Sequence, residues 1–185
     1  MMNIDTDYHN QDVTLQDQNT GTSQLLTFIL GSEEYGVDIL NVQEIRNWEP
    51  ATSIPNTPDY MLGVINLRGL IVPIIDLRNR FELERAEYGP LTVIVIVKLS
   101  GKPESSKTVG MVVDQVSDVY NISEEDIGEL PDFDGIVCRE FIKGVASVKD
   151  KMVIILDIDL LIDTGVLGNN TVSDDGDSQE LPAAS

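Results

Sequence analysis

The stretch Gly63–Leu77, GVINLRGLIVPIIDL, recurs without a gap as Gly144–Ile158, GVASVKDKMVIILDI. The second copy starts 81 residues after the first, and Gly, Val, Val, Ile and Asp recur at identical places. Each copy has two apolar runs separated by a turn that holds one cation, Arg68 or Lys149. Two such hairpins in one chain indicate an internal duplication.

A second pair of segments supports the duplication. Gly36–Asn47 (GVDILNVQEIRN) aligns with Gly110–Asn121 (GMVVDQVSDVYN), 74 residues later, with Gly, Val and Asn in common. The two matches occur in the same order and at similar spacing. We therefore predict two small β lobes of one design that pack against each other.

Short runs rich in β-branched residues, separated by turn residues, predict an all-β fold with few helical turns. The expected strands are Leu25–Leu30, Tyr35–Asp38, Leu62–Leu67, Leu70–Ile75, Thr92–Leu99, Thr108–Val116, Phe141–Val148 and Met152–Leu156. Because Thr92–Val97 hardly alternates between apolar and polar residues, we expect this strand to be covered on both faces.

The ends of the chain differ from its middle. Residues 1–23 and 163–185 hold nine of the 32 acidic residues and no Lys or Arg, and are expected to be disordered tails. The expected folded domain, residues 24–162, keeps 23 acidic residues against 12 basic ones, a net charge of −11. Such an acidic domain repels phosphate backbones and anionic lipid, which argues against nucleic-acid or membrane-surface binding.

Few residues are available for catalysis or cofactors. The only histidine, His9, lies in the N-terminal tail, which excludes His-based triads from the folded part. Cys138 is the only cysteine, which excludes an intramolecular disulfide and a thiolate metal cage. Phosphate-binding glycine loops are also absent. We expect a cytosolic protein that is not an enzyme and uses no cofactor or metal.

Carboxylate pairs are the remaining alternative for an active site. Asp76 with Asp114, or Asp157 with Asp159, would suit a hard cation or acid–base chemistry. The competing interpretation is that Asp76 and Asp157 cap short helical turns, each following a repeated strand. Ser123 with Asp126 resembles a capping box of a one-turn helix.

Binding residues are easier to identify. Arg68 lies at the tip of an apolar hairpin in an acidic protein, where it either keeps the turn soluble or binds partner carboxylates and carbonyls. Apolar residues at positions 39, 42 and 45 form a row that either faces outward from an amphipathic turn or packs in the core. Trp48 is either a core residue or an interface anchor.

These segments resemble the CheW-type chemotaxis coupling proteins. The resemblance is carried by FILGSEEYGVDIL (28–40), VQEIR (42–46), IPNTP (54–58), GVINLRGLIVPIIDLR (63–78) and GMVVDQVSDV (110–119), and more weakly by residues 141–161. The acidic tails have no counterpart in the resemblance.

The resemblance implies two five-stranded SH3-like β-barrels packed on an apolar seam. It also implies a non-catalytic adaptor that couples transmembrane chemoreceptors to a CheA-type histidine kinase. In the family, the helical-hairpin tip of the receptor lies against the groove between the lobes, and the kinase is held through its double-barrel regulatory domain. Such an adaptor is cytoplasmic and recruited to receptor arrays. The alternative is the same role in a pathway that controls pilus motility or development.

Four residues match family positions linked to receptor coupling. They are Val42, Glu44, Gly63 and Arg68. Gly63 has a structural alternative, a backbone position that tolerates no side chain. The resemblance identifies no kinase-binding residues.

We predict that the tails are dispensable for folding. They contain few large apolar residues and bury little surface. A chain that lacks residues 1–23 and 164–185 should melt within a few degrees of the full chain, a change of ~1 kcal/mol or less, when followed by circular dichroism. Loss of cooperative unfolding on trimming would contradict this prediction.

Overall fold

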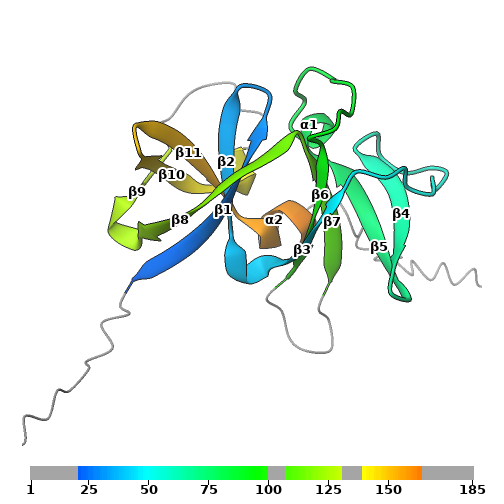
Figure 1. Cartoon of the computed structure of the whole chain (residues 1–185), viewed down its shortest axis with the longest axis horizontal. Coiled ribbons are helices and arrows are strands. Elements are labelled where there is room, and N and C mark those ends of the chain that lie inside the picture. The colour runs from blue at the N-terminus through cyan, green and yellow to red at the C-terminus, as the bar shows by residue number, and fades with distance from the viewer. Residues whose placement is uncertain (1–20, 100–106, 131–138, 164–185) are drawn as a thin grey trace, which may run out of the picture.

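The computed structural model describes residues 21–99, 107–130 and 139–163, which form two small β lobes with a few short helices (Figure 1). His9, Cys138 and nearly all of both tails lie outside these residues. Lobe A is a six-stranded sheet in the order β8 (Gln115–Ser123), β1 (Thr22–Leu30), β2 (Glu33–Asp38), β11 (Lys151–Leu156), β10 (Ile142–Val148) and β9 (Ile127–Gly128). Lobe B is a five-stranded sheet in the order β3 (Val42–Asn47), β6 (Val93–Lys98), β7 (Thr108–Val113), β5 (Leu70–Asp76) and β4 (Met61–Leu67).

The prediction of an all-β fold with two packed lobes is confirmed. Lobe A has a sixth strand, the two-residue β9, which the resemblance did not include. Strand β1 begins at Thr22, and Thr22 and Ser23 pair with Ser123 and Ile122. No helix among the described residues is long and apolar enough to cross a membrane.

Neither lobe is built from a single repeat. Strand β5 of the first repeat pairs in parallel with β7 of the second, with Ile74 opposite Gly110. Strand β11 of the second repeat pairs in parallel with β2 of the first, with Ile155 opposite Gly36. Each lobe therefore combines the first two strands of one repeat with the later strands of the other, and neither repeat closes a lobe alone.

The two repeated hairpins have the same local geometry. Both contain a register shift at the same place in their first strand, and both turn through two residues of positive φ. These residues are Arg68 and Gly69 (φ 53° and 91°) in one copy, and Lys149 and Asp150 (φ 49° and 66°) in the other. Paired positive φ values are typical of the tight hairpin turns that match the twist of antiparallel strands. The structure thus supports the duplication that the sequence indicates.

The buried apolar residues of the described chain form three clusters. The largest lies in the seam between them and draws on β1, β2, β5, β6, β7 and both α-helices, α1 (Leu77–Arg80) and α2 (Ile158–Asp163). The other two lie inside lobe B and lobe A. On β6, Val95 and Val97 face the seam while Ile94 and Ile96 face the interior of lobe B. The expectation that this strand is covered on both faces is confirmed.

Aromatic rings connect the two lobes across the seam. Phe28, Tyr35, Phe81 and Phe141 form a chain with successive ring centroids 6.2, 5.6 and 6.4 Å apart. The Arg80 guanidinium lies 4.4 Å from the Phe141 centroid and contacts the ring of Tyr60 as well. Such contacts add to the apolar burial that fixes the lobes relative to each other.

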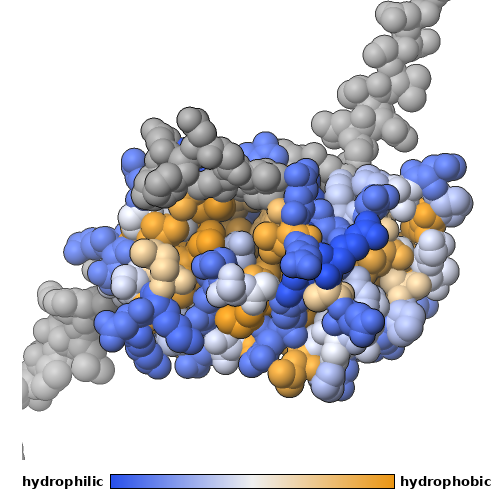
Figure 2. All heavy atoms as spheres, turned by 90° about the horizontal axis from the view of Figure 1, so that it is seen from above, coloured by the Kyte–Doolittle hydropathy of each residue, from blue (hydrophilic) through white to orange (hydrophobic). Residues whose placement is uncertain are grey.

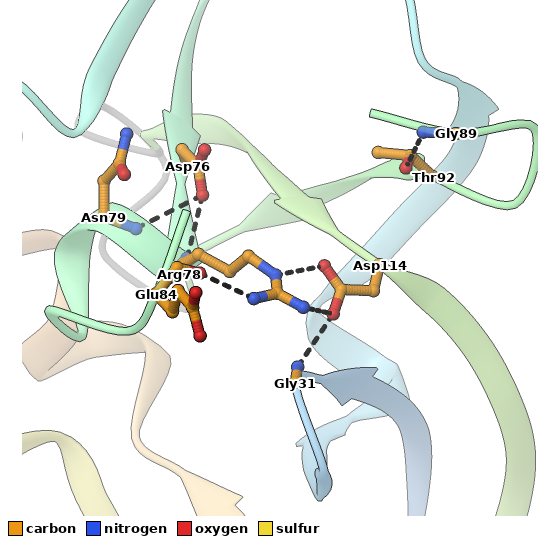
Figure 3. Close-up of polar contacts among 8 residues, drawn as sticks. All are labelled: Gly31, Asp76, Arg78, Asn79, Glu84, Gly89, Thr92 and Asp114. Atoms are coloured by element: carbon orange, nitrogen blue, oxygen red, sulfur yellow. Dashed lines mark hydrogen bonds and ion pairs between the residues drawn. The ribbon is translucent and has the colours of Figure 1, made fainter. Parts of the chain in front are cut away.

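The expected helix caps are partly confirmed. Asp76 Oδ1 accepts from the backbone N–H groups of Arg78 (2.8 Å) and Asn79 (3.3 Å) at the start of α1 (Figure 3). Asp157 Oδ1 accepts from Leu160 N in α2 (3.0 Å). The prediction of a capping box at Ser123 is wrong: a one-turn 3-10 helix follows it, but its side chain makes no capping bond.

A bidentate ion pair links lobe B to a turn of lobe A. The Nε and Nη2 atoms of Arg78 donate to the two carboxylate oxygens of Asp114 at 2.6 and 2.5 Å, and Gly31 N in the β1–β2 turn donates to Asp114 at 2.7 Å (Figure 3). Arg78 Nη1 also donates to the carbonyl of Glu84. Because the pair is mostly buried and bidentate, it is stronger than an ordinary surface ion pair.

We predict that Asp114→Ala lowers the free energy of unfolding by about 2 kcal/mol, since the mostly buried Arg78 loses its charged partner. Urea unfolding measures this change. The matched control is Asp59→Ala, because Asp59 is exposed and lies 3.8 Å from Arg85, and it should change stability by less than ~0.5 kcal/mol. Equal effects of the two substitutions would contradict a role for the Arg78–Asp114 pair.

Candidate functional site

The structure brings two of the four expected receptor-binding residues into direct contact. Arg68 Nη2 donates to Glu44 Oε2 at 2.8 Å, which joins the turn between β4 and β5 to the edge strand β3. The Arg68 side chain is 84% exposed. Its remaining guanidinium donors have no partner among the described residues and are available to a ligand.

The turn itself is held in shape by a side chain. Asn66 Oδ1 accepts from Gly69 N at 2.7 Å, which stabilises the positive φ angles of Arg68 and Gly69. Glu44 also lies 3.7 Å from Arg46. The arginine at the tip is therefore positioned from both sides, by a fixed turn and by a carboxylate on the edge strand β3.

A hollow of about 400 Å³ lies beside this ion pair. Its lining residues are Gln43, Glu44, Leu67, Arg68 and Leu70. Leu70 is exposed, whereas Leu67 is buried in the lobe B cluster. The hollow thus combines an apolar wall with a charged rim, an arrangement that suits a partner with both apolar and polar side chains.

A second hollow, of about 550 Å³, lies at the 3-10 helix η1 (Ile39–Asn41), and Ile39 and Leu40 contribute to its lining. Leu40 is 87% exposed, the highest value among the large apolar residues of the described chain. Asp38 Oδ1 accepts from Leu40 N at 2.9 Å and caps this turn. The segment from 38 to 44 therefore runs between the two hollows.

Val42 lies in this segment but contributes little surface. It is half-buried and packs against the seam cluster. The row expected at positions 39, 42 and 45 is not helical, because Ile39 belongs to η1 whereas Val42 and Ile45 belong to β3, and only Ile45 is exposed. Figure 2 shows that apolar residues form several groups on one face of the molecule, so exposure alone does not identify a docking surface.

Gly63 is not in a position to touch a partner. It is buried, its φ is +136°, and a Cβ atom on it would lie 2.1 Å from the carbonyl oxygen of Thr52. This close approach belongs to a backbone bridge in which Thr52 and Val64 exchange hydrogen bonds of 2.8 and 2.9 Å. The structural alternative for Gly63 therefore explains its environment, and any effect on binding acts through the backbone.

The second repeat has a counterpart of the Glu44–Arg68 pair. Lys149 Nζ lies 3.8 Å from Asp118 Oδ2 and 5.0 Å from the centroid of the Tyr120 ring. Asp118 and Lys149 occupy the positions that match Glu44 and Arg68 in the duplication. Sequence reasoning identified Lys149 as the counterpart of Arg68 but not Asp118 as its partner.

The carboxylates considered as an active site are engaged in structural bonds. Asp76 accepts from the hydroxyl of Tyr88 at 2.7 Å, and burial, followed by this Asp76 contact, raises the pKa of Tyr88. Asp114 holds Arg78. The described residues contain no group of three or more His, Cys, Asp or Glu that suits a metal ion. Trp48 packs on the lobe B cluster with its ring centroid 4.2 Å from that of Tyr88, which favours the core alternative.

We predict that Gly63→Ala lowers the free energy of unfolding by about 2–4 kcal/mol, through strain at positive φ and the clash with Thr52. Gly89→Ala is the control, because a Cβ atom at Gly89 meets no atom within 4 Å. It should cost less than ~0.5 kcal/mol in urea unfolding. A Gly63→Ala protein as stable as the control would contradict the strain and the clash that we assign to a side chain at this position.

Comparison with known proteins connects this site to a family. Residues 24–165 match the family described as the CheW-like domain. The chemotaxis protein CheW of Klebsiella aerogenes is 43% identical over 139 residues, which cover 75% of this chain and 81% of that protein. CheW of Rhizobium meliloti is 38% identical, with 75% and 86% covered.

A solved structure agrees with the fold. The scaffolding protein TtCheW from Thermoanaerobacter tengcongensis superimposes with a TM-score of 0.68 and 35% sequence identity, covering 76% of this chain and 92% of that one. The family match, residues 24–165, includes Glu44, Arg68 and all strands except the first two residues of β1. The chain therefore belongs to the CheW family of chemotaxis scaffolds, non-catalytic adaptors that couple receptors to a kinase.

Proposed function

We propose that the helical tip of a chemoreceptor docks on the surface formed by Glu44, Arg68 and the two hollows beside them. The observation that carries this proposal is the exposed Arg68 guanidinium at the rim of an apolar hollow, fixed by Glu44 at 2.8 Å. Both residues occupy positions that the family resemblance links to receptor coupling.

The surface has the features of a helix-binding groove. An amphipathic helix offers apolar side chains at i, i+3, i+4 and i+7. Exposed Leu40 and Leu70, which line the two hollows, can receive them. Removing these apolar groups from water supplies affinity. Arg68 then binds carboxylates or C-terminal carbonyls of the helix and fixes its register.

The same molecule holds the regulatory domain of a CheA-type histidine kinase on a separate surface. The two-lobed shape supports this arrangement, because it offers two ends of similar construction for different partners. Contacts that are weak singly become strong in an array on the cytoplasmic side of the membrane, where each partner raises the effective concentration of the next. The receptor signal passes to the kinase when receptor states differ in affinity for the adaptor.

We predict that Arg68→Ala weakens binding of a soluble receptor-tip fragment by roughly ten- to a hundred-fold while the fold is kept. Loss of a charge-assisted hydrogen bond at a docking surface costs about 1.5–3 kcal/mol, whereas an exposed ion pair adds little to stability. Titration calorimetry measures the affinity, and circular dichroism checks the fold.

Lys149→Ala is the matched control. Lys149 occupies the equivalent turn of the second repeat and is similarly exposed. Its removal should leave receptor affinity within about two-fold. Binding by Arg68→Ala that equals the wild type, or a larger loss in Lys149→Ala, would show that the site lies elsewhere on this fold.

A further inference from the structure

The duplication gives the molecule two ends of the same construction. We call the residues Glu44, Leu67, Arg68 and Leu70 of lobe B the Arg68 end, and their equivalents Asp118, Val148, Lys149 and Lys151 of lobe A the Lys149 end. Both ends have a two-residue turn with a cation at the tip and a carboxylate on the edge strand from the far side of the same sheet.

Two pairs of equivalent apolar residues are exposed to the same extent at both ends. Ile45 beside the Arg68 end is 44% exposed, and its equivalent Val119 is 42% exposed. Ile71 and its equivalent Met152 are 59% and 58% exposed. A partner that recognised only a cation, a carboxylate and nearby apolar groups would bind both ends.

The ends differ at two other positions, one exposed and one buried. At the Arg68 end, Leu70 lines the hollow, and Ile96 belongs to the buried apolar cluster of lobe B. The duplication places Lys151 where Leu70 lies, and the strand pairing places Thr27 opposite Gly36 as Ile96 lies opposite Gly110. Two polar residues of lobe A thus replace two apolar residues of lobe B.

These polar residues surround a buried carboxylate. The Glu34 side chain is 5% exposed, accepts from Thr27 Oγ1 at 2.9 Å and lies 3.3 Å from Lys151 Nζ. Burial by itself raises the pKa of Glu34, but hydrogen bonds from Ser117, Thr27 and Lys151, with the charge of Lys151, lower it overall. Glu34 is therefore ionised at neutral pH and holds the Lys151 ammonium over the end of lobe A.

We infer that the Glu34–Lys151 pair closes the Lys149 end to the apolar helix that the Arg68 end binds, and so determines which of two equivalent ends serves as the receptor site. This inference rests on the proposed docking of the receptor at the Arg68 end.

The physical reason is the cost of desolvation. A helix that covers Leu70 removes apolar surface from water, which is favourable. The same helix on the Lys149 end would cover an ammonium group that is now largely exposed, and the buried carboxylate below prevents it from moving away. The pair thereby discriminates by rejecting the wrong end rather than by improving the right one.

One experiment exchanges the residues between the ends. Glu34→Thr with Lys151→Leu gives lobe A the residues that lobe B has at 108 and 70, and both are changed together because either charge alone would be left unpaired. The full chain is titrated with a soluble receptor-tip fragment by calorimetry. We expect one fragment per wild-type chain and two per double variant. In an Arg68→Ala background, the double substitution should recover affinity at least ten-fold, and Lys149→Ala should abolish that gain.

The reverse exchange is Leu70→Lys, with Leu70→Met as its control. Leu70 is exposed, so neither substitution disturbs the core. Leu70→Lys should weaken binding at least ten-fold, and Leu70→Met less than three-fold. If the double variant does not fold, the comparison of Leu70→Lys with Leu70→Met tests the inference.

Two results would overturn the inference: a folded double variant that still binds one fragment, or a Leu70→Lys chain that binds like the wild type. Failure of the proposed function looks different. In that case the wild-type chain does not bind the fragment, or Arg68→Ala binds it with the same affinity as the wild type.

Discussion

The parallel pairings of β5 with β7 and of β11 with β2 are the constraint on which the rest of the structure depends. They cross between the repeats, so each lobe is completed only by strands from the other half of the chain. The seam cluster is consistent with this exchange, because it contains residues of the exchanged strands β1 and β2 of lobe A and β6 and β7 of lobe B. The Arg78–Asp114 pair and the aromatic chain then hold the lobes in one arrangement.

Local features of this fold could be predicted from the sequence, and long-range ones could not. The hairpins at Arg68 and Lys149, the caps at Asp76 and Asp157 and the double-faced β6 follow from turn residues, spacing and apolar runs. The exchange of strands could not be predicted, because parallel partners are chosen by packing between residues far apart in the sequence. Gly63 shows the same limit. The sequence indicates a position that tolerates no side chain, but the Thr52 carbonyl that excludes one is a tertiary contact.

At the candidate site, too, the sequence predicts local features but not the long-range contacts. Arg68 was recognised as a turn cation, but its bond to Glu44 spans 24 residues and appears only when the sheet curls until β3 approaches the β4–β5 turn. Leu40 carried no sequence signal, since its exposure depends on the 3-10 turn that Asp38 caps. Duplication accounts for the two similar ends, and the Glu34–Lys151 pair is the difference that we propose keeps the receptor helix from the Lys149 end.

The central claim is that a receptor helix docks on β3 and the β4–β5 turn. Hydrogen exchange of the full chain, measured by mass spectrometry with and without a soluble receptor-tip fragment, tests it most directly. The account predicts slower exchange in the segments 39–47 and 66–70 and unchanged exchange in 147–152. Protection of 147–152 with none at 66–70 would contradict it.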